Sequence, residues 1–290
     1  MAAGAVLVWR RGDELGRALD QVSLTRLEVA GALAVAGTIL IQLVWSALLR
    51  GLGAEPARRD AASVFFVSQL GKYVPGSVWP VVAQMQFGVR WRVPRAVMLA
   101  ANVLLLGMVT ASGLAVGAVL LPWSSPDGLR RYWWLLLLLL PLAAGLHPRT
   151  VPAVLDRLLR RLGRDPLPVR PGLGSLAASA GWALLAWLVL GLHVAVLAGA
   201  FGHVGVRELA AFAGGMGLAW AAGLAFIPAP AGAGVRDAVL VLTLSPMTGT
   251  TGALTVALAS RALLLVADVL LAAVGALARP VGRVGPVSPS

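Results

Sequence analysis

Four long apolar runs decide what this chain can fold into. They cover about residues 27–49, 95–121, 173–200 and 250–278, and a shorter leucine-rich run covers about 132–147. A helix needs about 20 apolar residues to cross the ~30 Å hydrocarbon core of a bilayer. Of the 290 residues, 59% are apolar and only 12% are charged, which is typical of chains that dissolve in bilayers. The sequence therefore predicts an all-α polytopic membrane protein.

The rest of the composition excludes most catalytic chemistry. The chain has no cysteine and only three histidines, and it shows no Ser-His-Asp spacing, paired-carboxylate site, metal-ligand cluster or P-loop. We therefore expect neither an enzyme nor a cofactor. The net charge of +12 comes from arginines that lie mostly between the apolar runs, so it indicates membrane topology and anionic headgroups rather than nucleic acid.

Two segments between the long runs look wrong for simple crossings. Each of them, about 61–89 and about 208–247, consists of two short apolar pieces around a break rich in proline and glycine. Interrupted apolar segments at corresponding places in two halves indicate re-entrant or broken helices in an inverted repeat. We predict one membrane domain over 1–279, with a first repeat at about 27–121, a connector at about 132–172 and a second repeat at about 173–279.

Loop charge gives an orientation. The connector from 149 to 170 is rich in arginine, which predicts a cytoplasmic position, a cytoplasmic C-terminus and hairpins that enter from opposite faces. Its apolar residues recur at helical spacing opposite the arginines, as in an interfacial amphipathic helix. The apolar start at residues 2–9 spans about half a bilayer, so whether it is a complete element stays open. The tail at 280–290 reads as disordered.

The first break is the stretch "GKYVPGSVWP" at 71–80. An interrupted helix is tolerated at membrane depth only where protein or a water-filled cavity lines the break. Half-helix N-termini would favour an anion there, and Lys72 adds a full positive charge. The alternative is that Lys72 snorkels to the interface, with Tyr73 and Trp79 as belt residues, and this alternative is favoured for Trp79.

The second break, "FIPAPAGAGVRD" at 226–237, repeats this pattern. Pro228 and Pro230 end one half-helix, and the glycines permit close backbone approach. Asp237 can complement the dipole of the next half-helix, but a cation is unfavourable at such a place. A bound phosphate would explain why Arg236 is there.

Two further ionisable residues, Arg261 and Asp268, lie in the middle of the last apolar run. Such residues face the protein interior and are paired or functional. They share a face but lie too far apart to pair with each other. Arg261 with Asp237, and Asp268 with either Arg236 or Lys72, are the cross-helix pairings that the sequence allows, and a purely structural ion pair is the alternative.

Other polar residues in the apolar runs have simpler interpretations. His193 could relay protons, but a hydrogen bond between helices is the favoured interpretation. Asn102 and Gln42 are expected to make interhelical polar contacts.

These motifs resemble a known family. "GKYVPGSVWP", "RVPRAVMLAANVLLL", "PAPAGAGVRDAVLVL" and "ASRALLLVADVLLA" are similar to the lysylphosphatidylglycerol synthase transmembrane-domain family, also described as flippase-like, over about residues 15–279. These 290 residues contain no soluble aminoacyltransferase domain. The family motifs fall on Lys72, Tyr73, Pro75, Gly76, Trp79, Pro230, Gly232, Gly234, Arg236, Asp237 and Arg261.

The resemblance implies lipid handling. We expect an ATP-independent flippase for an anionic, phosphate-bearing lipid, either a phospholipid or a polyprenyl-phosphate-linked sugar, in a cytoplasmic membrane of bacterial type. The phosphate would meet Lys72, Arg236 and Arg261, while Asp237 and Asp268 would hold those cations in place or take protons. The alternative is a non-transporting membrane subunit that presents lipid to a partner enzyme. A lipid-modifying synthase or glycosyltransferase as partner, and a homo-oligomer, stay open.

Overall fold

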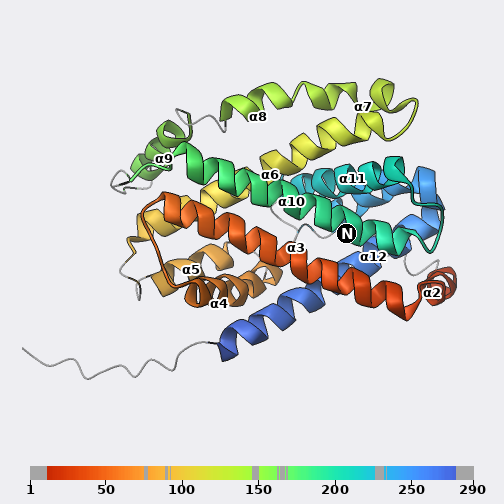
Figure 1. Cartoon of the computed structure of the whole chain (residues 1–290), viewed down its shortest axis with the longest axis horizontal. Coiled ribbons are helices and arrows are strands. Elements are labelled where there is room, and N and C mark those ends of the chain that lie inside the picture. The colour runs from red at the N-terminus through yellow and green to blue at the C-terminus, as the bar shows by residue number, and fades with distance from the viewer. Residues whose placement is uncertain are drawn as a thin grey trace, which may run out of the picture.

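The fold is described from a computed structural model in which residues 12–74, 78–88, 91, 93–145, 150–161, 163, 167, 169–225, 232 and 234–278 are placed. Within these residues every regular element is helical, and no strand occurs (Figure 1). The all-α prediction is therefore confirmed. The apolar start and the C-terminal tail lie outside the described residues.

Four helices are long and apolar enough to cross a membrane within the described part of the chain. They are α3 (Leu24–Gly51), α6 (Arg95–Trp123), α10 (Leu173–Ala198) and α12 (Val235–Leu277). The shortest of them, 26 residues long, measures about 39 Å at 1.5 Å per residue, more than the ~30 Å hydrocarbon core. These helices coincide with the four predicted crossings, which confirms a polytopic membrane protein.

The first interrupted segment forms a helical hairpin. α4 (Arg58–Gln69) continues into the 3₁₀ turn η1 (Leu70–Tyr73), and α5 (Trp79–Gly88) runs back from the break. Gly71 permits this turn, because a Cβ at that position would lie 2.9 Å from the Cβ of Trp79. The two legs are joined by a hydrogen bond from Gln84 Nε2 to Ser68 Oγ of 2.8 Å. The predicted break is thus present, and it lies between two packed half-helices.

The second interrupted segment has the same plan on a larger scale. α11 (Val206–Ala225) ends before the proline-rich stretch, and α12 begins after Gly234. Inside α12, Gly249 has φ 70° and ψ 166°, so the helix is kinked there. This kink separates an initial segment, residues 235–248, from the long final segment, residues 250–277, close to the boundary predicted at about 250. Gly249 can take these angles because it has no Cβ.

The connector departs from its prediction in one respect. The leucine-rich run at 132–147 is divided between α7 (Gly128–Leu136) and α8 (Leu139–Gly145), so it does not form one continuous crossing helix. The following α9 (Thr150–Arg161) is amphipathic as predicted, with Arg160 and Arg161 in its last turn. However, Val151, Leu155 and Leu159 are buried in the protein core, so the chain itself covers part of this apolar face, while Val154 is 52% exposed.

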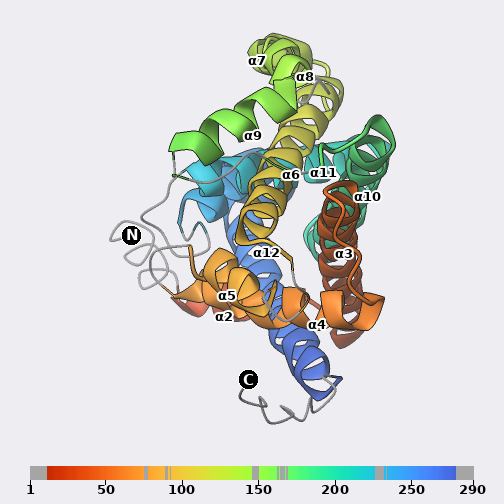
Figure 2. The same cartoon turned by 90° about the vertical axis from the view of Figure 1, so that its left-hand side faces the viewer.

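Helices from the two halves of the chain pack against each other. α3 lies along α10, α6 lies against α11, and α12 lies against α4 (Figures 1 and 2). The first hairpin thus contacts the last crossing of the second half, while the second hairpin contacts the last crossing of the first half. An inverted repeat predicts such an exchange, but the repeat itself and the domain boundaries stay predictions.

Small residues bring α6 and α11 together. A Cβ on Gly217 would lie 2.5 Å from the carbonyl oxygen of Gly113, and one on Gly117 would lie 3.2 Å from that of Gly214. Glycines at this spacing let two helix backbones approach closely, which is how many helices associate in membranes. The contact fixes the position of α11, including the side chains of Met216 and Trp220 on it.

Of three buried polar residues, one bonds to other helices and two bond within their own helix. His193 bridges helices as expected: its Nδ1 lies 2.8 Å from the carbonyl oxygen of Ala30 in α3, and its Nε2 lies 2.9 Å from Ser260 Oγ in α12. The interhelical prediction is wrong for Asn102 and Gln42. Asn102 Nδ2 donates to the carbonyl of Met98, and Gln42 Nε2 donates to Ser46 Oγ, each one turn away on its own helix.

Candidate functional site

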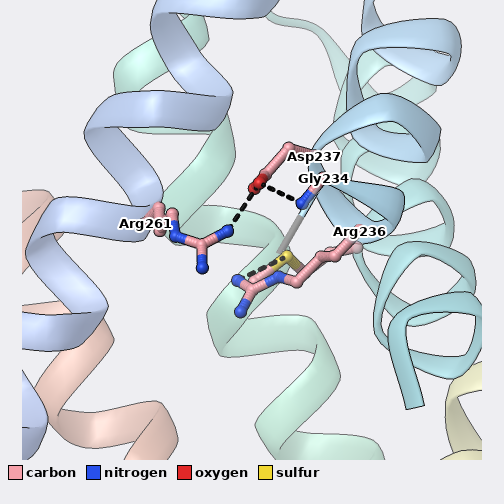
Figure 3. A network of polar contacts seen from close by, with 5 residues as sticks. Gly234, Arg236, Asp237 and Arg261 are labelled. Carbon is pink, nitrogen blue, oxygen red and sulfur yellow. Dashed lines mark hydrogen bonds and ion pairs between the residues drawn. The ribbon is translucent and has the colours of Figure 1, made fainter. Parts of the chain in front are cut away.

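The start of α12 is built on Gly234. This residue has φ 86°, a conformation that favours glycine, and it directly precedes the helix. Its N–H donates to Asp237 Oδ2 at 3.1 Å, so the carboxylate closes the first turn (Figure 3). A carboxylate in this position also complements the positive end of the helix dipole. The dipole role expected for Asp237 is therefore supported by its geometry.

The same carboxylate holds Arg261. Arg261 Nη1 lies 2.6 Å from Asp237 Oδ2, across the kink from the final segment of α12 to the initial one (Figure 3). Both side chains are partly buried, at 34% and 19% exposure. A charge-assisted hydrogen bond of this length is strong for its kind. Of the pairings that the sequence allowed, Arg261 with Asp237 is the one the structure forms.

Among Lys72, Arg236 and Arg261, only Arg236 makes no ion pair with a carboxylate of the described residues. Within the described residues, its guanidinium lies 5.2 Å from the centre of the Trp220 ring and 3.8 Å from the sulfur of Met216, and no ion pair joins it to an acid. The side chain is partly buried. A guanidinium has five N–H donors, and neither a ring face nor a thioether uses them fully. Arg236 is therefore held in place with donors to spare.

Glycines make room for this arrangement. A Cβ on Gly223 would lie 3.1 Å from the Cβ of Arg236, and one on Gly232 would lie 2.9 Å from the Cα of Gly223. Gly232 also has φ 67°, which favours glycine. The predicted use of glycine for close backbone approach at this break is thus observed. Pro230 lies outside the described residues.

The tip of the first hairpin forms a second ionic cluster. Lys72 Nζ lies 2.7 Å from Asp268 Oδ2, and the Tyr73 hydroxyl donates to the same oxygen at 2.5 Å. The side chain of Asp268 is 2% exposed and that of Lys72 is 24% exposed. Lys72 is therefore paired with a buried carboxylate. Its partner is Asp268. Of the two cations that the sequence allowed for Asp268, Arg236 and Lys72, the structure pairs it with Lys72.

The two clusters belong to one region. Arg261 and Asp268 lie seven residues apart on α12, about 10 Å along its axis, and each belongs to one of the two clusters. Lys72, Arg236 and Arg261 supply three positive charges, and the two aspartates supply two negative ones. The region therefore carries one excess positive charge, which belongs to Arg236 because the other two cations are paired.

The remaining predicted site residues contribute less. Trp79 begins α5, is 48% exposed and lies beside Gly71, and its role as a belt residue stays a prediction. Pro75 and Gly76 lie outside the described residues. Two cavities, of about 340 and 400 Å³, lie around the C-terminal end of α3 rather than at Arg236. No group of three or more His, Asp or Glu that could hold a metal ion occurs in the described part of the chain.

Sequence reasoning missed Trp220 and Met216, the side chains that hold Arg236. They lie in the stretch "GGMGLAWAAG", where every other residue except one leucine is glycine or alanine. The available signal was a large side chain among small ones, because such a side chain fills the space that glycine and alanine leave beside a neighbouring helix. Their pairing with Arg236 depends on how α11 packs against α12.

Comparison with known proteins gives one clear relationship. The family described as the lysylphosphatidylglycerol synthase TM region matches residues 1–272. The comparison with curated proteins finds no match. The matched region includes both breaks, both ion pairs and Arg236. The chain belongs to the lysylphosphatidylglycerol synthase TM region family.

Proposed function

We propose that the protein is an ATP-independent transporter that moves an anionic, phosphate-bearing lipid between the leaflets of a membrane. The family links the chain to lipid handling in a membrane. The observation that carries the proposal is Arg236, a partly buried guanidinium with no acidic partner among the described residues. Arginine is suited to phosphate because its planar fork can donate two parallel hydrogen bonds.

The neighbours of Arg236 support an anionic ligand. The N-terminal end of α12 contributes a positive dipole end, and Arg261 adds a second guanidinium that uses one nitrogen for Asp237. A phosphate beside Arg236 would use the free donors and balance the excess positive charge. The acyl or prenyl chains of the lipid would stay in the bilayer, where they cost nothing to solvate.

The paired residues have a supporting role in this proposal. Asp237 keeps Arg261 oriented, and Asp268 keeps Lys72 beside the last crossing helix. A phosphate that reaches the site competes with these carboxylates for Lys72 and Arg261. Such competition provides a way to loosen the contact between the first hairpin and α12 when lipid binds, and transport needs a movement of this kind.

No chemical step on the lipid is proposed. We further propose that the protein lies in a cytoplasmic membrane with a cytoplasmic C-terminus. The partner class is then a synthase or glycosyltransferase that supplies the lipid. The phosphate chemistry is common to phospholipids and polyprenyl-phosphate-linked sugars, so the cargo is to be identified by mass spectrometry of lipids that purify with the protein.

The test is lipid movement in liposomes. Purified protein should move a fluorescent anionic phospholipid between leaflets without ATP, and Arg236→Ala and Arg261→Ala should lose this activity while they elute as the folded protein does. Unchanged movement in both variants would overturn the site. Binding without movement in the wild type would instead identify a subunit that presents lipid to an enzyme, and a changed lipid mass would identify an enzyme.

A further inference from the structure

A cavity of about 340 Å³ lies among α3, α4 and α10, at the C-terminal end of α3. This volume falls within the usual range for binding sites of small ligands. It is separate from the Arg236 region in the residues that form it. The question is what kind of molecule its lining would accept.

The walls of the cavity are apolar. Leu43 and Leu49 of α3, Ala61 of α4 and Trp182 of α10 line it. Trp182 is 36% exposed and lies on α10, and α3 and α10 are both long and apolar enough to cross a membrane. A hydrocarbon chain of a surrounding lipid would therefore meet an apolar wall here.

The mouth of the cavity is cationic. Arg50 in the last turn of α3 and Arg58, the first residue of α4, both line it, and both are exposed. Within the described residues, neither makes an ion pair with an acid. Arg58 is also unfavourably placed beside the positive end of the α4 dipole. An anion at this mouth would offset both charges and that unfavourable position.

A buried amide adds a polar point to the lining. Gln42 is 5% exposed and donates through Nε2 to Ser46 Oγ, while its carbonyl oxygen accepts no hydrogen bond from the described residues. It lies two turns before Arg50, about 12 Å along the helix axis. The lining thus matches an amphiphile with an anionic head and an apolar chain.

We propose that this cavity binds an anionic phospholipid of the surrounding bilayer, with its phosphate between Arg50 and Arg58 and one chain along Trp182. The occupant is a lipid rather than a soluble phosphate because most of the lining is apolar. The site does not depend on the transport function proposed above. It would hold α3, α4 and α10 together at the end of the bundle where the first hairpin begins.

Native mass spectrometry of the full chain tests the proposal. Phosphatidylglycerol is titrated into protein that carries Arg236→Gln, which removes the proposed transport site. Adding Arg50→Gln and Arg58→Gln together should weaken binding about thirtyfold, because one exposed hydrogen bond from each arginine to the phosphate contributes roughly a factor of five. Arg59→Gln is the matched control: it removes a charge at the next position of α4, outside the cavity lining, and should leave binding unchanged.

Two further measurements test where the lipid chain lies and which class of ligand binds. A brominated phosphatidylglycerol should quench tryptophan fluorescence less in Trp182→Phe than in the parent protein. Phosphatidylcholine and glycerol phosphate should each bind much more weakly than phosphatidylglycerol. Equal binding by the double variant and the Arg59→Gln control, equal binding of phosphatidylcholine, equal binding of glycerol phosphate, or unchanged quenching in Trp182→Phe would overturn the proposal.

Discussion

The tip of the first hairpin and the start of α12 both carry a cation at a break between half-helices, but only one of these cations is neutralised. Lys72 shares the buried Asp268 with Tyr73, whereas Arg236 lies on Trp220 and Met216 and makes no ion pair with an acid of the described residues. The first arrangement is a closed contact that holds a hairpin against a crossing helix. In the second, the guanidinium of Arg236 keeps N–H donors that it does not use within the described residues. The same feature of the sequence therefore serves structure at one break and, as we propose, recognition at the other.

Removing the carboxylate of the closed contact should have the largest effect. Asp268→Ala leaves Lys72 partly buried without its partner, and breaking a buried ion pair in this way costs about 3–5 kcal/mol. The free energy of unfolding in detergent should fall by that amount. Lys72→Met combined with Asp268→Leu should fall by much less, because no unpaired charge remains. A double variant that loses as much stability as Asp268→Ala would show that the ion pair does not hold the hairpin against α12.

At Arg236 we expect a small effect on stability and a large effect on lipid binding. Arg236→Gln should change the free energy of unfolding little, because the side chain has no acidic partner to lose. It should weaken binding of an anionic lipid about a hundredfold, since two hydrogen bonds to a charged group are worth roughly 3 kcal/mol together. Titration with phosphatidylglycerol in native mass spectrometry measures this effect, and the Arg50→Gln, Arg58→Gln background removes the second lipid site. A large loss of stability with unchanged binding would make Arg236 a structural residue.

The kink at Gly249 allows a sharper comparison of the two segments of α12. Gly249→Ala forces a Cβ into a conformation that only glycine takes easily, at a cost of about 1–3 kcal/mol. The expected outcome is a lower melting temperature together with slower lipid transport, because the kink sets the approach of Arg261 to Asp237. Thr250→Ala is the matched control, since it changes the adjacent residue without this strain and should behave as the wild type. Equal melting temperatures and transport rates for the two variants would show that the kink sets neither property.

Trp220 should have the smallest effect of the four. Trp220→Leu keeps an apolar side chain on α11 but removes the ring face beneath the guanidinium, a contact worth about 0.5–2 kcal/mol. Anionic lipid should then bind several-fold more weakly, because Arg236 is less well positioned. Affinity equal to that of the wild type, measured by the same titration, would show that the ring does not orient Arg236.

The breaks in the helices could be predicted from the sequence, whereas the partners of their charges could not. Proline and glycine act locally, so the start of α5, the end of α11 and the start of α12 follow from the residues at those places. Asp268 had two allowed cations, and only the packing of α4 against α12 brings Lys72 to it rather than Arg236. The kink at Gly249 lies near the predicted boundary, but its angles depend on tertiary packing.

The wrong predictions have a common cause. Asn102 and Gln42 were expected to reach other helices because buried polar groups need partners, yet each finds one on its own helix. A side chain can bond to a residue one turn away without any tertiary contact. Similarly, the leucine-rich run at 132–147 has the composition of a crossing, but α7 and α8 divide it at residues 137–138. Composition alone does not fix where a helix stays continuous.

A structure of the protein with bound anionic lipid would locate the phosphate relative to Arg236. We expect phosphate oxygens about 2.7–2.9 Å from the guanidinium nitrogens of Arg236. A phosphate bound at Lys72 or elsewhere, with the Arg236 guanidinium still in contact with only Trp220 and Met216, would show that Arg236 does not bind the lipid.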